Sequence, residues 1–227
     1  MLKNGYSKRY KSDRSTRLYP VEFAVRAFLG TYPGLRMPKD RYEGQRVLDL
    51  GYGDGRNLPL LNELGMKVHG VEISEDINRH VQKRCRRWGI RAVLKTGSNA
   101  SIPFTDGYFA YVLACHSAYY VEHGDTFDRN LAEIARVTQA GGYWIASFPK
   151  KGSFILKKAQ RLGGGHYRIT RDPYGLRKGT IFRVFDSEKD IRKTLGPFFR
   201  DIRIGSCDDD YWGIRQKVWI VVCRRKS

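Results

Sequence analysis

The chain has 227 residues, which is enough for one α/β domain with a full core and few for two domains of ordinary size. Hydrophobic residues make up 41% and charged residues 29%, a balance that excludes a largely disordered chain. The formal net charge of +19 predicts attraction to something anionic, such as nucleic acid, a phosphorylated metabolite or an acidic surface.

Targeting and cysteine patterns exclude several other classes. The first residues, MLKNGYSKRYKSDRSTR, contain no apolar signal-peptide core, and no later segment approaches the roughly 18 apolar residues of a membrane span. We therefore expect a cytoplasmic protein with no membrane span. The four cysteines are widely scattered and form no CxxC pair, so neither a zinc site nor a disulfide framework is indicated.

Short apolar runs alternate with amphipathic helical patterns from residue 46 onward, which is typical of βαβ units around a parallel sheet. An earlier helix is predicted near residues 21–29. The predicted strands are residues 46–50, 67–73, 91–95, 108–115 and 143–148, and the predicted helices are residues 57–64, 74–89 and 125–137. Residues 200–205 and 216–223 are predicted to pair as a closing, hairpin-like sheet edge.

Local signals refine several boundaries. Ser74 is a predicted N-cap, and Ser187 with Asp190 has capping-box-like spacing before a short helix. The segment QAGG (139–142) is predicted to turn into the fifth strand. Residues 149–183 fall outside the alternation, and residues 151–183 carry nine Lys or Arg against the single acid Asp172. Because this segment follows the fifth strand, we expect it on the ligand side of the sheet, where it could gate or select a substrate.

The strongest motif is LDLGYGDGRN, in which Asp49 ends the first strand and Gly51, Gly53 and Gly55 follow before a helix. Glycines let the backbone turn sharply and approach a ligand closely, and a helix N-terminus adds a positive dipole end. Dinucleotide enzymes show GxGxxG, whereas here the third glycine comes one residue earlier. Glu72 closes the second strand, where such folds place a carboxylate to accept the hydroxyl protons of an adenosine ribose.

With these motifs, residues 40–225 resemble the class I S-adenosylmethionine-dependent methyltransferases. The resemblance rests on LDLGYGDG, VHGVEIS, IPFTDGYFAYV and QAGG. It implies an α/β fold with a Rossmann-like seven-stranded methyltransferase sheet, mostly parallel with an antiparallel edge, and helices on both faces. It also implies residues 46–227 as the cofactor-binding domain, with 149–183 as a basic substrate-side insertion, and residues 1–45 as a basic N-terminal lid.

The resemblance implies roles for particular residues. The Gly51 to Gly55 loop, Tyr52 included, would contact the methionine part of S-adenosylmethionine, and Asp49 would help hold its amino group. Glu72 would bind the ribose and Ile73 would lie against the adenine. The remaining candidate cofactor contacts are Ser98, Asn99, Cys115 and, in the lid, Tyr19.

The chain departs from the family pattern at two positions. The family often has an acid at the position of Ser98 to bind the adenine amino group, and Asn99 is the predicted substitute here. Ala110 replaces the aspartate of the family's FD pair.

Methyl transfer from a sulfonium is a direct displacement, so a base is optional and alignment of donor and acceptor matters most. For a hydroxyl acceptor, His116 is the candidate proton acceptor because it follows the fourth strand on the ligand side of the sheet. His123 and His166 are the alternatives.

Four functional hypotheses follow. The leading one is a methyltransferase acting on a small-molecule or saccharide acceptor, anionic given the basic segment. The second makes RNA the acceptor, because of the net charge and the basic, tyrosine-rich N-terminus. The third is a non-catalytic cofactor- or nucleic-acid-binding protein on the same fold, and the fourth, disfavoured by the glycine spacing, is a nicotinamide dehydrogenase.

Overall fold

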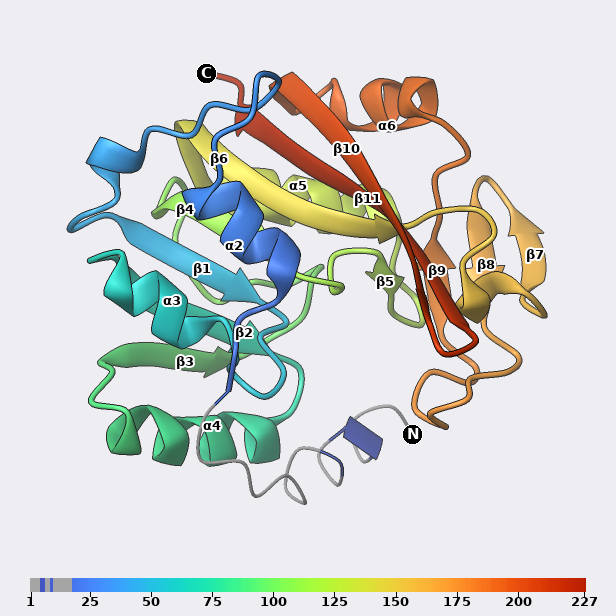
Figure 1. Ribbon diagram of the computed structural model, residues 1–227, viewed down its shortest axis with the longest axis horizontal. Helices are drawn as coiled ribbons and strands as arrows, with labels where there is room; N and C mark the ends of the chain where they lie inside the picture. Colours follow the sequence, from blue (N-terminus) through green and yellow to red (C-terminus); the bar gives the residue numbers. More distant parts are fainter. Residues whose placement is uncertain (1–4, 7–8, 10–17) are drawn as a thin grey trace.

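Seven strands form one sheet in the computed structural model, which describes residues 5, 6, 9 and 18–227 (Figure 1). The strand order is β10-β11-β6-β4-β1-β2-β3. The five parallel strands are β1 (Arg46–Leu50), β2 (Lys67–Glu72), β3 (Ala92–Thr96), β4 (Phe109–Ala114) and β6 (Thr138–Pro149). All of β4 is buried, as expected for a central parallel strand covered on both faces.

The last two strands form the antiparallel edge of this sheet. β10 (Phe199–Tyr211) pairs with β11 (Ile214–Arg225), and β11 in turn pairs antiparallel with β6, with Val221 opposite Ala146. The predicted fold class, a mostly parallel seven-stranded sheet with an antiparallel edge, is confirmed.

Helices cover both faces of the sheet, as predicted (Figure 1). The helices are α2 (Glu22–Leu29), α3 (Leu58–Glu63), α4 (Glu75–Arg87), α5 (Phe127–Val137) and α6 (Glu188–Leu195). The first three pack in one apolar cluster with Val47 of β1, and α5 and α6 pack in the other with Leu48, the next residue of the same strand. This alternation is the period-2 pattern of a strand buried on both sides.

A second sheet, of four strands, stands beside the carboxyl ends of the parallel strands and is called the cap sheet below (Figure 1). Its order is β5 (Tyr120–Val121), β9 (Ile181–Arg183), β8 (His166–Arg168) and β7 (Gln160–Gly163). Short 3₁₀ turns lie at Lys39–Arg41 and Phe154–Leu156. Most of the cap sheet comes from the basic segment 149–183, for which the sequence predicted no strands, because runs of two to four residues show no periodicity.

One local expectation was wrong, and another was confirmed only in its position. The segment QAGG is not a separate turn: it lies within β6, where Gly141 has a φ of +73° and the pairing with β4 shifts register. Ser74 occupies the N-cap of α4 but its side chain makes no capping hydrogen bond. The cap at Ser187 is confirmed, since its Oγ accepts from the Asp190 N–H at 3.2 Å.

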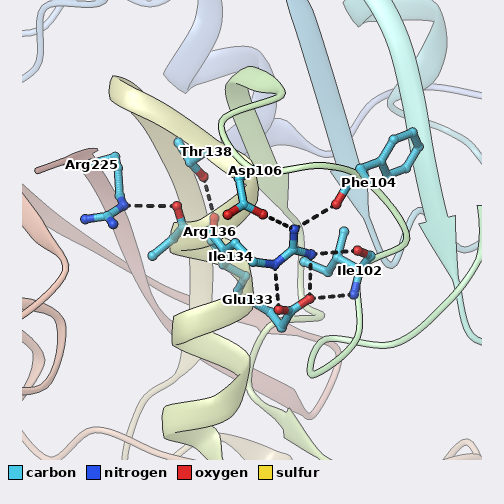
Figure 2. Close-up of polar contacts among 9 residues, drawn as sticks. Ile102, Phe104, Asp106, Glu133, Ile134, Arg136, Thr138 and Arg225 are labelled. Atoms are coloured by element: carbon cyan, nitrogen blue, oxygen red, sulfur yellow. Dashed lines mark hydrogen bonds and ion pairs between the residues drawn. The ribbon is translucent and has the colours of Figure 1, made fainter. Parts of the chain in front are cut away.

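Arg136, near the end of α5, ties that helix to the loop between β3 and β4 (Figure 2). Its guanidinium donates to both carboxylate oxygens of Glu133, to the carbonyl oxygens of Ile102 and Phe104, and to Asp106, at 2.7–2.9 Å. Every N–H of the side chain is used, and Glu133 also accepts from the Ile102 N–H. The loop that carries Ser98 and Asn99 is therefore anchored to the helix behind the sheet.

We expect Arg136→Met to lower the free energy of unfolding by about 2 kcal/mol, because the carbonyl oxygens of Ile102 and Phe104 lose this donor and the Glu133 carboxylate loses its counter-charge. Urea denaturation followed by circular dichroism measures this change. The control is Arg129→Met on the same helix, which removes an exposed ion pair with Asp125 and should cost less than about 0.5 kcal/mol. Equal effects of the two substitutions would contradict the anchoring role.

Candidate active site

A cavity of about 1270 Å³ lies at the carboxyl ends of the parallel strands. One wall comes from the loops that follow β1, β2, β3 and β4, and the other from the cap sheet and β11. Parallel sheets bind ligands at this edge. Nine predicted site residues line the cavity, namely Gly51, Tyr52, Gly53, Glu72, Ile73, Ser98, Asn99, Cys115 and His116.

The loop after β1 requires its glycines. Gly51, Gly53 and Gly55 have φ values of +70°, +57° and +81°, which residues other than glycine rarely adopt. A Cβ on Gly51 would lie 2.4 Å from Cβ of Ser117, and one on Gly55 would lie 2.6 Å from Cγ1 of Val81 in α4. Gly55 thus lies beneath the cavity, whereas Gly51 and Gly53 present backbone to it.

Asp49 is fully buried in β1 and lies below the cavity wall rather than on it. Neither of its carboxylate oxygens has a hydrogen-bond partner of ordinary geometry among the described residues. Burial raises the pKa of Asp49 to about 8, against the opposing influence of the Asn57 side chain. The negative charge of Glu72 also raises the pKa of Asp49, and Asp49 in turn contributes to the raised pKa of Cys115; both of these neighbours line the cavity.

Glu72 ends β2 and points its carboxylate at the glycine loop. Its Oε2 accepts from the Gly53 N–H at 3.0 Å, and its Oε1 accepts from the Ile73 N–H at 2.9 Å. Burial raises the pKa of Glu72, and the two backbone donors oppose that shift. Each oxygen keeps a lone pair for a further donor.

Ser98 and Asn99 follow β3 and both line the cavity. Ser98 exchanges backbone hydrogen bonds with Ser101, which closes a tight turn. The amide nitrogen of Asn99 donates to the carbonyl oxygens of Ser117 and Tyr120, at 2.9 and 3.2 Å. In this orientation the Asn99 side-chain oxygen remains available to accept a hydrogen bond, as an amino-group donor would require.

His116, two residues beyond the end of β4, has a φ of +52°. Its backbone N–H donates to Oγ of Ser147 at 3.0 Å, and its ring Nδ1 lies 3.1 Å from the same oxygen. Burial, aided by the positive charge of Arg177, lowers the pKa of His116 to about 4. The ring is therefore neutral at pH 7 and lies at the edge of Phe23, with ring centroids 5.9 Å apart.

The other predicted residues lie in different surroundings. Tyr52 and Cys115 are on the cavity wall, and burial raises the pKa of the Cys115 thiol well above its usual value. Tyr19 is 69% exposed and does not line the cavity. Of the alternative histidines, His123 lines the cavity and His166 does not. Residues 1–4, 7–8 and 10–17 of the predicted lid lie outside the described residues.

Sequence reasoning missed part of the wall that lies opposite the glycine loop. Tyr119, Tyr120 and Arg177 line the cavity there, and the hydroxyl oxygens of Tyr120 and Tyr6 lie 2.8 Å apart. The Tyr119-Tyr120 pair, a few residues beyond the fourth strand, was a possible signal, although tyrosines at that position are equally compatible with core packing. Within the described part of the chain no cluster of His, Cys, Asp or Glu could hold a metal ion, and no helix is long and apolar enough to cross a membrane.

Comparisons with known proteins agree on one family. Residues 47–142 match a family model described as a methyltransferase domain. A protein of Mycolicibacterium smegmatis described as a "probable S-adenosylmethionine-dependent methyltransferase" is 27% identical over 128 residues, covering 56% of this chain and 47% of the relative. A demethylmenaquinone methyltransferase of Tropheryma whipplei is 29% identical over 99 residues, covering 44% of this chain and 39% of the relative. The chain thus spans about half, or less, of these curated relatives.

Solved structures share the fold across nearly the whole chain. The PH0226 protein of Pyrococcus horikoshii matches with a TM-score of 0.66 and 17% identity, covering 96% of this chain and 99% of that one. An S-adenosylmethionine-dependent methyltransferase of Methanosarcina mazei matches with a TM-score of 0.61 and 17% identity, covering 92% and 99%. The family model thus identifies residues 47–142 as a methyltransferase domain, and the curated relatives and the shared fold support a class I S-adenosylmethionine-dependent methyltransferase.

Proposed function

We propose that the chain is an enzyme that moves the methyl group of S-adenosylmethionine to a small-molecule or saccharide acceptor. The observation that carries the proposal is the buried carboxylate of Asp49, which has no hydrogen-bond partner of ordinary geometry within the described residues, beneath the glycine loop. An unsatisfied buried polar group costs roughly 1–3 kcal/mol, and more when charged. Although Asp49 lies below the cavity wall, the positive charge of a methionine ammonium group held at the glycine loop would offset that cost, so the residues present fit this cofactor.

The rest of the cofactor has matching partners along the same wall. The free lone pairs of Glu72 suit the two ribose hydroxyls, and Ile73 offers an apolar surface to the adenine. The side-chain oxygen of Asn99 suits the adenine amino group, which compensates for Ser98 at the family's acidic position. Gly51 and Gly53 allow close approach because neither carries a side chain.

S-adenosylmethionine supplies an electrophilic methyl group on a sulfonium, which is transferred by direct displacement. The residues of this chain have to align the acceptor and exclude water. The cap sheet supplies the opposing wall. His116 is neutral at pH 7 and can accept a proton at a ring nitrogen from a hydroxyl acceptor, although a pKa of about 4 makes it a weak base. Its main contribution is then to orient the acceptor.

The position of the cap sheet favours a small acceptor over RNA. Residues of the cap sheet and of β11 face the glycine loop across the cavity, which limits what can reach the transferred methyl group. The net charge of +19 is the reason to test RNA directly. Steeply salt-dependent RNA binding would support that alternative, and no binding at low salt would remove it. Accumulation of S-adenosylhomocysteine with any acceptor would exclude the non-catalytic alternative.

We expect Glu72→Gln to weaken S-adenosylmethionine binding by at least about tenfold, since a carboxylate that accepts two hydroxyl protons is replaced by an amide that opposes the backbone N–H groups of Gly53 and Ile73. Calorimetry on the full chain measures the affinity, with NADH as the comparison ligand. Glu75→Gln, an exposed acid three residues later, is the matched control and should leave the affinity unchanged. Unchanged affinity in Glu72→Gln would contradict the assignment.

Cofactor binding should also depend on the pH through Asp49. Its pKa is about 8 in the free protein, and a bound ammonium group would lower it, so binding releases a proton. The affinity should therefore rise with increasing pH below pH 8, by up to about tenfold per pH unit.

Titrations between pH 6 and 7.5 in buffers of different ionisation enthalpy measure both the affinity and the released proton. Asp49→Asn should bind more weakly and lose this pH dependence. An affinity that falls as the pH rises over this range would overturn the role of Asp49.

A further inference from the structure

The loop that joins β8 to β9, residues 169–180, carries an ion pair that the proposed cofactor site does not use. The side chain of Asp172 is fully buried and that of Arg177 is 17% exposed. Arg177 lines the cavity, as do its neighbours Lys178 and Thr180. A buried ion pair at a cavity wall is costly unless every group in it is satisfied.

Asp172 is satisfied completely within this loop. Its carboxylate accepts from the backbone N–H groups of Tyr174, Leu176 and Arg177 at 2.9–3.1 Å, and from Nε and Nη2 of Arg177 at 3.0 and 2.8 Å. Burial opposes ionisation, but the hydrogen bonds outweigh it and lower the pKa of Asp172. The acid is thus ionised and has no lone pair to spare for a ligand.

Arg177 is satisfied on one edge only. A guanidinium has five N–H donors arranged in forks, and Asp172 occupies the fork formed by Nε and Nη2. Nη1 makes no hydrogen bond with any described residue, so the fork formed by Nη1 and the second N–H of Nη2 is open. That edge has the geometry that binds a carboxylate or phosphate with two parallel hydrogen bonds.

Aromatic rings hold the guanidinium in place. Its Cζ lies 5.6 Å from the ring centroid of Phe154 and 5.5 Å from that of Tyr174. The position of Arg177 is therefore set before any ligand arrives, which reduces the entropy lost on binding.

The charge of Arg177 also reaches the rest of the cavity despite its pairing with Asp172. It lowers the pKa of His116 and opposes the burial-induced rise in the pKa of Tyr119 and Tyr120. The positive potential of Arg177 is thus felt at the strand end where the acceptor would be aligned.

We infer that the methyl acceptor carries a carboxylate or phosphate group, and that the open edge of Arg177 binds it across the cavity from the glycine loop. The inference rests on the proposed function, because it assigns the acceptor half of the same cavity. In this arrangement Asp172 is a positioning residue and Arg177 sets the specificity for an anionic acceptor.

The test titrates the full chain, loaded with S-adenosylhomocysteine, with inorganic phosphate, acetate and the neutral acetamide. Arg177→Lys keeps a cation for Asp172 but loses the fork, and the double variant D172N/R177Q removes both charges without leaving a buried acid unpaired. The control is E188Q/R192Q, which removes one negative and one positive charge, as D172N/R177Q does, but from an exposed ion pair on α6. Thermal unfolding of each variant checks that it is folded.

We expect phosphate or acetate, but not acetamide, to bind the wild type, with at least about tenfold weaker binding in both Arg177 variants and no change in the control. The stronger of the two anions identifies the acceptor group. Failure of both anions to bind, or equal binding by the variants, would overturn the inference.

The affinity for S-adenosylhomocysteine separates the remaining explanations. It should be the same in the wild type and the Arg177 variants. A loss in the variants would show that Arg177 binds the cofactor's own carboxylate, and would overturn the inference while leaving the proposed function intact. If the wild type does not bind S-adenosylhomocysteine at all, the proposed function fails, and phosphate titration of the unloaded chain still tests Arg177.

Discussion

Three strand-end loops meet at Ser117, and the shape of the cavity depends on that meeting. The Ser117 hydroxyl donates to the carbonyl oxygen of Leu50 at the end of β1, and its Cβ fills the space that a side chain on Gly51 would need. Its own carbonyl oxygen accepts from Asn99, in the loop after β3. A small residue here lets the loops after β1, β3 and β4 pack closely, so the proposed methionine and adenine contacts have fixed relative positions.

The two buried aspartates near the cavity have opposite electrostatic roles. Asp172 has its counter-charge and five hydrogen bonds within its own loop, and its pKa is lowered. Asp49 has neither within the described residues, and its pKa is raised to about 8. The first contributes to the folded structure without a ligand. The second is a local destabilisation that a cationic group of suitable size would relieve.

Much of the main sheet could be predicted from the sequence because its central strands are apolar runs separated by amphipathic helices. The glycine loop and Glu72 were also predictable. The spacing of the three glycines marks a sharp turn that approaches a ligand, and Glu72 ends the second strand, where such folds place a ribose-binding carboxylate. The cap sheet was not predictable, because its strands are too short for any pattern to show. The partners of His116 were also hidden: Ser147 belongs to β6, and only the folded register brings the two together.

The role of Arg177 also could not be predicted from the sequence. A basic segment with one acid predicts a charged surface, but nothing in its sequence distinguishes the arginine that pairs with Asp172 from its eight basic neighbours in residues 151–183. The distinction comes from the turn after Asp172, which returns the chain so that one guanidinium edge faces the acid. Burial and ring contacts arise only in the folded structure, and they distinguish Arg177 from the other basic residues of this segment.

The cap sheet also has a consequence for how the protein could diversify. The proposed cofactor wall is encoded almost entirely before residue 118, whereas β7, β8 and β9 come from one stretch between β6 and α6. Substitutions or length changes in that stretch can remodel the proposed acceptor wall while the strands that bear the glycine loop keep their register. The two walls can therefore evolve at different rates, with Tyr120 of β5 as a shared boundary between them.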